Sequence, residues 1–292
     1  MSDVYAAVEA IALSTSHPTV TICDVLEVSR SAYYDWLTRE PGVREFELDE
    51  LTPAIVEIFV RHRRRYGARR IASELADGDI VCSPKRVADV LKSQGLRAIQ
   101  PRSFVPKTTD SRHTLGYSPN LLLDADEPTR FDELWVGDLT YLPLRGGGFG
   151  YLAALLDRCS RDIVAWSIDA TMTESLVLDV LHRAIRERQP KAGLVHHTDR
   201  GGQYAGGEYR AVLRRASMKQ SMSRADNCYD NAFMESCWSS IKRELEVTEY
   251  ESVAAAQTVV AEYVRYYRFE RKHSAIGYLT PHQFATRTVT QN

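Results

Sequence analysis

The sequence predicts an α/β domain in which mixed strands are flanked by helices, preceded by all-α helix-turn-helix segments. Three observations lead to this prediction. Residues 134–169 show three consecutive strand-like runs separated by short turns. After them, helix-like and strand-like runs alternate up to residue 245, which is typical of a sheet covered by helices. Residues 19–95, in contrast, show two patterns of helix, tight turn and helix.

The first helical pattern lies within a segment that we delimit as residues 1–40. Apolar residues at Ile22, Val25 and Leu26 precede a break near Val28, and a second helix starts at residue 29 or 30. This pattern is typical of a helix-turn-helix DNA reader, but a plain helical hairpin gives the same pattern. Both interpretations stay open for this segment.

The second helical pattern, within residues 41–100, is strongly basic. A helix over Ala68 to Leu75 is followed by a turn and by a second helix that starts at Ser83 and Pro84. Residues 61–107 carry twelve Lys and Arg against four Asp and Glu, which indicates a surface for a polyanion or a solvated charged face. The candidate DNA contacts in this segment are Arg63, Arg64, Arg65, Arg69, Arg70, Lys85 and Arg86.

Residues 101–130 are polar and interrupted by prolines, so we interpret them as a linker or arm. The predicted core, residues 131–250, starts with the strands WVGDLTYLPL, FGYLAALLD and DIVAWSID, which would form an antiparallel meander. The expected elements that follow are a helix at 174–188, a strand ending at residue 197, a helix near 208–216, a strand near 220–223 and a helix over 231–245. Residues 251–292 add one amphipathic helix and a basic tail.

The composition points to an intracellular protein. The chain has 292 residues, 44% of them hydrophobic and 26% charged, with a net charge of -2. It contains no apolar run near the roughly 20 residues that span a bilayer, and the first residues lack the basic flank of a signal peptide. We therefore expect no membrane contact and a cytoplasmic location.

Three carboxylates stand where the predicted fold can bring them together. Asp138 lies within a strand that is otherwise apolar, Asp199 follows the fourth strand, and Glu235 lies in the first turns of a late helix. Each has an ordinary interpretation: an exposed position on an edge strand, a turn or helix cap, and a surface helical glutamate. Together on one rim of the sheet they would form an oxygen-ligand site for Mg²⁺ or Mn²⁺.

The motifs WVGDLTYLPL, HTDRGGQYAG, SRADNCYDNAFMESCWSSIKREL and RKHSAIGYLTPHQF occur in this order, and Lys242 follows Glu235 by seven residues. In these motifs the chain resembles the DDE transposases of the bacterial insertion-sequence family known as IS-three, in its second reading frame, and more distantly the retroviral integrases. The resemblance implies a ribonuclease H-like catalytic core with Asp138, Asp199 and Glu235 as catalytic residues and ligands of two ions. It also implies that Lys242 contacts DNA phosphate.

The implied activity is metal-dependent cleavage and strand transfer of double-stranded DNA at element ends and at a target. Such a reaction implies a homo-oligomer, at least a dimer on DNA, and association with the bacterial nucleoid. Family members usually work as a fusion with an upstream reading frame, so an inactive downstream product or DNA-binding regulator is one alternative. A ribonuclease H-type nuclease is the other.

The remaining candidate residues surround this core. Where the family has Asn and Pro in its last motif, this chain has Arg268 and Lys272. His196 and His197 are expected to orient Asp199 or a phosphate, or to be structural. Asp230 and Asn231 stand where the last core helix begins, as caps or close to DNA. The other predicted DNA contacts are Arg200, Arg271 and Lys272.

Overall fold

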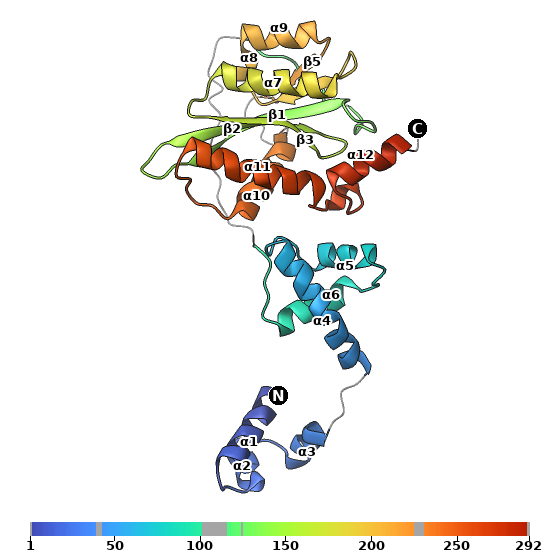
Figure 1. Ribbon diagram of the computed structural model, residues 1–292, viewed down its shortest axis with the longest axis vertical. Coiled ribbons are helices and arrows are strands. Elements are labelled where there is room, and N and C mark those ends of the chain that lie inside the picture. The colour runs from blue at the N-terminus through green and yellow to red at the C-terminus, as the bar shows by residue number, and fades with distance from the viewer. Residues whose placement is uncertain (1, 39–42, 101–115, 124, 225–230, 291–292) are drawn as a thin grey trace.

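The computed structural model describes residues 2–38, 43–100, 116–123, 125–224 and 231–290. It shows three parts that follow one another along the long axis of the molecule (Figure 1). Two small helical units are followed by a larger unit in which helices cover a sheet. Most of the expected linker, residues 101–115 and 124, lies outside the described residues, as does the loop at 226–229.

The N-terminal unit consists of α1 (Ser2–Ser14), α2 (Thr19–Val25) and α3 (Arg30–Thr38). The helices α2 and α3 occupy the positions that the sequence predicts, whereas α1 adds a helix that the pattern did not indicate. Tyr5, Val8, Ile22, Cys23 and Tyr33 form its own small apolar core. This unit is therefore stabilised by contacts among its own helices.

The second helical unit consists of α4 (Val43–Arg61), α5 (Ala68–Asp77) and α6 (Pro84–Ser93). The backbone N–H of Arg86 donates to the Ser83 hydroxyl oxygen at 3.3 Å, so Ser83 caps α6, and Pro84 follows in the first turn. The helix α4 was not expected and contains Pro53. The apolar residues of this unit belong to the same buried cluster as those of α10 and α11.

Five strands form one sheet in the order β3-β2-β1-β4-β5. The strands β1 (Leu134–Pro143), β2 (Phe149–Asp157) and β3 (Ile163–Asp169) pair antiparallel, which confirms the predicted meander. The strands β4 (Val195–Thr198) and β5 (Lys219–Met222) pair parallel, β4 with β1 and β5 with β4. The order places β1 at the centre, so the end of β4 lies beside the middle of β1.

Helices cover both faces of the sheet (Figure 1). The helices α7 (Glu174–Arg188), α8 (Gly202–Ala205) and α9 (Gly207–Arg215) share one buried cluster with the sheet. The helices α10 (Ala232–Leu245) and α11 (Val253–Phe269) pack on the opposite face. A 3-10 turn, η2 (Ser274–Ile276), and α12 (Pro281–Thr290) follow, so the expected tail contains a helix.

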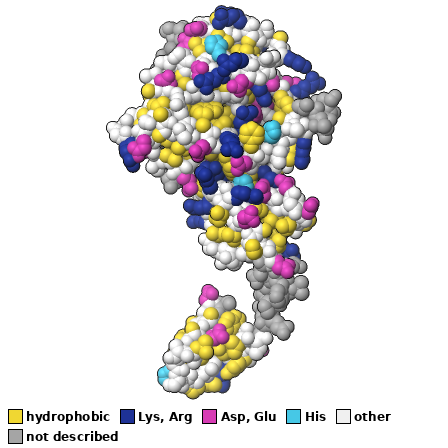
Figure 2. Space-filling view, in the orientation of Figure 1, with side chains coloured by type: hydrophobic (Ala, Val, Ile, Leu, Met, Phe, Trp, Pro, Cys, Tyr) yellow, Lys and Arg dark blue, Asp and Glu magenta, His cyan; other side chains and the backbone are white. Residues whose placement is uncertain are grey.

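Charged side chains of both signs are interspersed over the visible face of the two larger units (Figure 2). No helix within the described ranges is both long enough and apolar enough to cross a membrane.

Candidate active site

Asp138 lies in the middle of β1, the central strand of the sheet. Its Oδ1 accepts the backbone N–H of Leu139 at 2.8 Å, and its Oδ2 accepts the indole N–H of Trp238 at 3.0 Å. Trp238 is buried on α10, so this hydrogen bond joins the late helix to the central strand. A carboxylate oxygen has two lone pairs, so each oxygen of Asp138 can still bind a cation.

Gly137 allows the strands around Asp138 to approach closely. A Cβ atom at this position would lie 2.7 Å from Leu155 Cδ2 and 3.0 Å from His196 Cε1. These atoms belong to the two neighbouring strands, β2 and β4. Only glycine therefore fits between them without displacing a side chain.

Asp199 directly follows β4, as the sequence predicts. Its Oδ1 accepts the backbone N–H of Gly201 at 2.9 Å, so it also stabilises the turn that leads into α8. Both interpretations of this residue from the sequence thus apply: it is a turn aspartate, and it lies at the carboxyl end of a strand next to β1.

Asp199 and Glu235 both lie within electrostatic reach of Asp138. Burial raises the pKa of Asp138 well above its ordinary value, the charge of Asp199 raises it further, and that of Glu235 adds a smaller effect. Glu235 is exposed, and Met234 and Trp238 form the buried side of α10. In the described part of the chain, no three His, Cys, Asp or Glu side chains are grouped closely enough to hold an ion as they stand.

Lys242 lies on α10, the helix that carries Glu235. Its side chain is half-buried, with Nζ 5.6 Å from the centroid of the Tyr141 ring. Burial lowers the pKa of Lys242, and the charge of Asp138 opposes that change. Lys242 therefore interacts electrostatically with Asp138, and its contact with DNA phosphate stays a prediction.

The two histidines are fully buried and point to different neighbours. The His196 Nε2 lies 2.7 Å from the Tyr209 hydroxyl, and burial lowers the pKa of His196 to about 3. The His197 Nδ1 lies 2.8 Å from the Ser221 hydroxyl, and its Nε2 lies 3.3 Å from the Ser223 hydroxyl. These contacts favour the structural interpretation.

Asn231 precedes α10, but its side chain makes no capping hydrogen bond within the described residues. It is 6% exposed. Asp230, the other expected cap, lies outside the described residues.

The predicted DNA contacts fall into two groups. Exposed side chains are those of Arg63, Arg64, Arg69 and Lys85. Half-buried side chains are those of Arg65, Arg70, Arg86 and Arg200. Among the latter, the Arg200 Nε donates to the Ser223 carbonyl at 2.7 Å, and its guanidinium lies 4.5 Å from the Tyr117 ring centroid.

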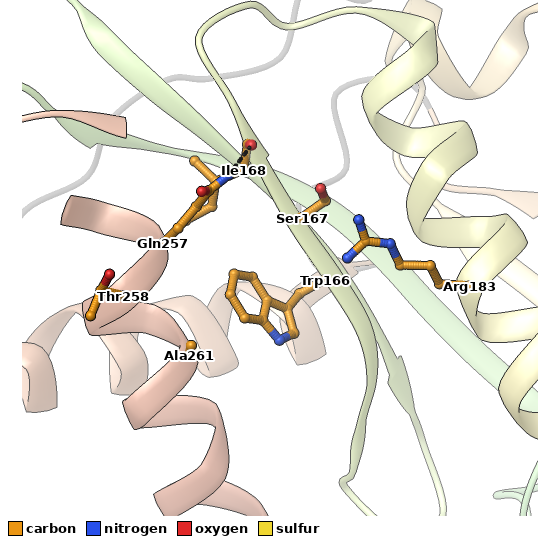
Figure 3. Close-up of a pocket in the computed structure, with 7 residues that line it drawn as sticks. All are labelled: Trp166, Ser167, Ile168, Arg183, Gln257, Thr258 and Ala261. Atoms are coloured by element: carbon orange, nitrogen blue, oxygen red, sulfur yellow. Dashed lines mark hydrogen bonds between the residues drawn. The ribbon is translucent and has the colours of Figure 1, made fainter. Parts of the chain in front are cut away.

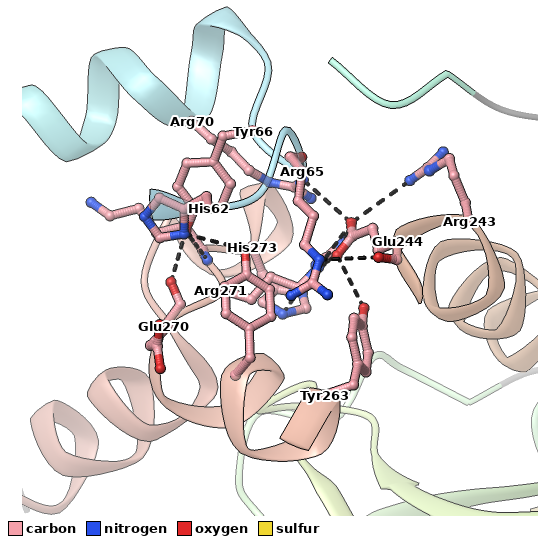
Figure 4. A network of polar contacts seen from close by, with 12 residues as sticks. His62, Arg65, Tyr66, Arg70, Arg243, Glu244, Tyr263, Glu270, Arg271 and His273 are labelled. Carbon is pink, nitrogen blue, oxygen red and sulfur yellow. Dashed lines mark hydrogen bonds and ion pairs between the residues drawn. The ribbon is translucent and has the colours of Figure 1, made fainter. Parts of the chain in front are cut away.

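Arg271 and Lys272 require a correction, because both side chains are only 4% exposed. Arg271 binds the carboxylate of Glu244, and Lys272 binds that of Asp77 at 2.6 Å. Buried cations need such partners, so these two stabilise the fold and do not face DNA. A glutamate that the sequence did not single out, Glu244, is the centre of this polar network (Figure 4).

One cavity of about 430 Å³ lies outside the site, beside the edge strand β3 (Figure 3). Its lining residues are Trp166, Ser167, Ile168, Arg183, Gln257, Thr258 and Ala261. The strand β2 separates β3 from β1, so this cavity does not include the carboxylates.

Comparisons with known proteins agree with this architecture. Residues 128–228 and 216–281 match two integrase core domain families, and residues 47–104 match a family of HTH-like domains. The chain is 39% identical over 265 residues to the insertion element IS600 uncharacterized 31 kDa protein of Shigella sonnei, covering 90% of this chain and 97% of that protein.

Two further relatives are transposases by name. The transposase for insertion sequence element IS904 of Lactococcus lactis is 36% identical over 248 residues, which cover 84% of this chain and 97% of the relative. The transposase InsF for insertion sequence IS3A of Escherichia coli is 35% identical over 272 residues, which cover 92% of this chain and 94% of the relative. The chain therefore belongs to the IS-three (IS3) family of insertion-sequence transposases, enzymes of the polynucleotidyl transferase type with an integrase catalytic core.

Proposed function

We propose that this transposase cuts and joins DNA at Asp138, Asp199 and Glu235, with divalent ions as cofactors. The observation that carries the proposal is the placement of Asp138 on the central strand next to the end of β4: Gly137 pairs with Thr198, and Asp138 and Asp199 directly follow these two residues. Carboxylate oxygens are the donors that Mg²⁺ and Mn²⁺ prefer, so this arrangement fits a site for either ion. Two ions, when bound, supply Lewis-acid activation of the attacking oxygen and stabilisation of the leaving oxygen.

The residues of the chain have separate roles in this proposal. The three carboxylates hold the ions, and Lys242 binds a phosphate beside them. In the first step, water attacks the phosphorus at the element end and a 3′-hydroxyl leaves. In the second, this 3′-hydroxyl attacks a target phosphodiester, a new P–O bond forms, and a 3′-oxygen of the target leaves.

DNA reaches this site from the helical unit α4–α6. The exposed cations Arg63, Arg64, Arg69 and Lys85 are the contacts we propose there, because exposed Lys and Arg neutralise phosphates. Joining two ends requires two sites, so we also propose at least a dimer on DNA. The mass of the protein measured by light scattering, with and without DNA, tests this.

The experiment for the activity uses labelled duplex DNA that carries the sequence flanking the coding region, with Mg²⁺ or Mn²⁺. The wild type should nick and join strands, and Asp199→Asn should bind the DNA without doing either. Asp179→Asn, which changes a half-exposed carboxylate paired with Arg183 on α7, is the matched control and should remain active.

Metal-dependent cutting that survives in Asp199→Asn would contradict the proposed site. Binding without cutting in the wild type would mean that the chain needs a fused upstream reading-frame product for activity.

A further inference from the structure

A buried network of charged side chains, which we call the Glu244 hub, joins the helical unit α4–α6 to the helix that carries Glu235 and Lys242 (Figure 4). Arg271 donates to both oxygens of Glu244, with its Nε 2.8 Å from Oε2 and its Nη2 2.7 Å from Oε1. The Tyr263 hydroxyl donates to Oε2 at 3.0 Å. The Glu244 side chain is 2% exposed, so this network is inside the protein.

Two arginines of the helical unit reach the same glutamate. The Arg65 Nε, in the loop between α4 and α5, donates to the Glu244 carbonyl oxygen at 3.0 Å. The Arg65 guanidinium also lies 4.5 Å from the centroid of the Tyr266 ring. The Arg70 Nη1, in α5, lies 3.6 Å from Glu244 Oε1. The hub therefore attaches both the loop and α5 to α10.

A second set of contacts connects the helical unit α4–α6 to the segment that follows α11. Lys272 Nζ donates to the Asp77 carboxylate at 2.6 Å and to the Ser73 carbonyl at 3.0 Å, and both residues belong to α5. The Tyr66 hydroxyl donates to the Glu270 carbonyl at 2.7 Å and accepts the backbone N–H of Lys272 at 2.9 Å. Directional hydrogen bonds as well as apolar contacts thus attach the helical unit to α10 and to the segment that follows α11.

The helix α10 carries Glu244 together with Glu235 and Lys242, two residues of the candidate active site. Glu244 follows Lys242 by two residues and Glu235 by nine. The same helix is hydrogen-bonded to Asp138 through Trp238. A movement of the helical unit relative to α10 would therefore change the distance from DNA on that unit to the carboxylates.

We infer that Glu244 is a positioning residue, which fixes this distance and so selects the phosphodiester that is cut. The inference rests on the proposed function, in which the exposed cations of α4–α6 and its adjoining loop hold the element end. Glu244 itself contacts no DNA, because its carboxylate is surrounded by Arg271, Tyr263 and Arg70. Its effect is on where the chain cuts.

The test maps nick positions to single nucleotides on labelled duplex DNA carrying the sequence that flanks the coding region, with Mg²⁺. Glu244→Gln keeps the shape of the side chain but removes its charge. Asp77→Asn weakens the second set of contacts at a side chain that is 58% exposed, so this variant should fold even if the first does not. Each variant should raise the share of nicks displaced by one or more nucleotides about fivefold, which corresponds to roughly 1 kcal/mol.

Two controls separate positioning from a general loss of stability. A short DNA with a free 3′-hydroxyl, too short to reach α4–α6, should be joined equally well by the wild type and by Asp77→Asn. Arg145→Ala, which breaks an exposed ion pair with Glu251, should leave the nick positions unchanged.

If Glu244→Gln and Asp77→Asn both cut more slowly but at unchanged positions, the inference is overturned and these contacts only stabilise the fold. A wild type that does not cut with any divalent ion would overturn the proposed function and this inference with it.

Discussion

The indole N–H of Trp238 donates to Oδ2 of Asp138 at 3.0 Å and so connects α10, which carries Glu235 and Lys242, to the central strand of the sheet. The two residues are 100 positions apart in the sequence. This contact therefore contributes to the relative placement of three of the proposed functional side chains.

Replacing Trp238 by Phe should lower strand transfer about tenfold while the protein stays folded. The change removes a hydrogen bond to a carboxylate, which is worth about 1.5–3 kcal/mol, and leaves most of the apolar contact in place. Gel-based strand-transfer rates measure the effect, and circular dichroism checks the fold. Trp166→Phe, on the edge strand β3, is the matched control; an equal loss of activity there would refute the specific role of Trp238.

Asp138→Asn should abolish cutting and joining but raise the Tm of the metal-free protein. Burial and the charge of Asp199 both oppose the ionised form of Asp138, so a neutral side chain of the same shape relieves that unfavourable interaction. Calorimetry without divalent ions measures the change. An unchanged or lower Tm would argue against charge crowding at this site.

Glu244→Gln should lower the free energy of unfolding by about 3–5 kcal/mol, because it leaves the buried Arg271 without its ionic partner. The exposed pair of Arg145 and Glu251 provides the comparison, since its side chains are 71% and 65% exposed. Arg145→Ala should cost about 0–1 kcal/mol. Urea denaturation compares the two, and similar losses would contradict the burial argument.

Stability should fall as the pH decreases below 6.5, in part because of His273. Burial lowers the pKa of His273 to about 2, and the charges of Arg271, Arg70 and Arg161 contribute to this shift. The unfolded chain takes up a proton at its ordinary pKa of 6.5, whereas the folded chain does not, so protonation favours unfolding between these two values.

The slope contributed by His273 is at most about 1.4 kcal/mol per pH unit. Urea denaturation at several pH values from 7.5 to 5 measures it. His273→Gln should make the curve flatter, while the exposed His282→Gln should not. Glu244 remains ionised throughout this range, because its hydrogen bonds from Arg271 hold its pKa below the ordinary value.

Gly137→Ala should destabilise the protein by about 1–3 kcal/mol, because the added Cβ would overlap with Leu155 and crowd His196. Gly207→Ala is the control, since a Cβ there meets no atom within 4 Å and the residue starts a helix. Thermal unfolding should show a lower Tm for the first variant only. Equal Tm values would mean that the strands around β1 adjust without cost.

The sequence predicted the elements whose patterns are local. The strand-like runs of β1 to β3 and the helical pattern of α7 depend only on neighbouring residues, and both agree with the structure. The expected position of Asp199 after the fourth strand likewise agrees with the structure. The helices α1 and α4 were missed; Pro53 inside α4 is a residue that usually ends a helix.

The partners of charged residues could not be predicted in this way. Arg271 and Lys272 belong to a basic stretch, and such a stretch on its own resembles a DNA-binding tail. Lys272 is buried because Asp77, 195 positions earlier in the chain, lies beside it. The role of Glu244 could not be predicted from the sequence, because a glutamate near the end of a helix is common. Its role depends on the three arginines that surround it in the folded chain.

The central place of β1 in the sheet also constrains when the enzyme becomes active during its synthesis. Asp138 is made early in the core, but its parallel neighbour β4 follows only after α7, and Glu235 arrives with α10. A nascent chain that has not yet released α10 from the ribosome holds only two of the three carboxylates. In the proposed function, cleavage therefore requires that nearly the whole core has been synthesised.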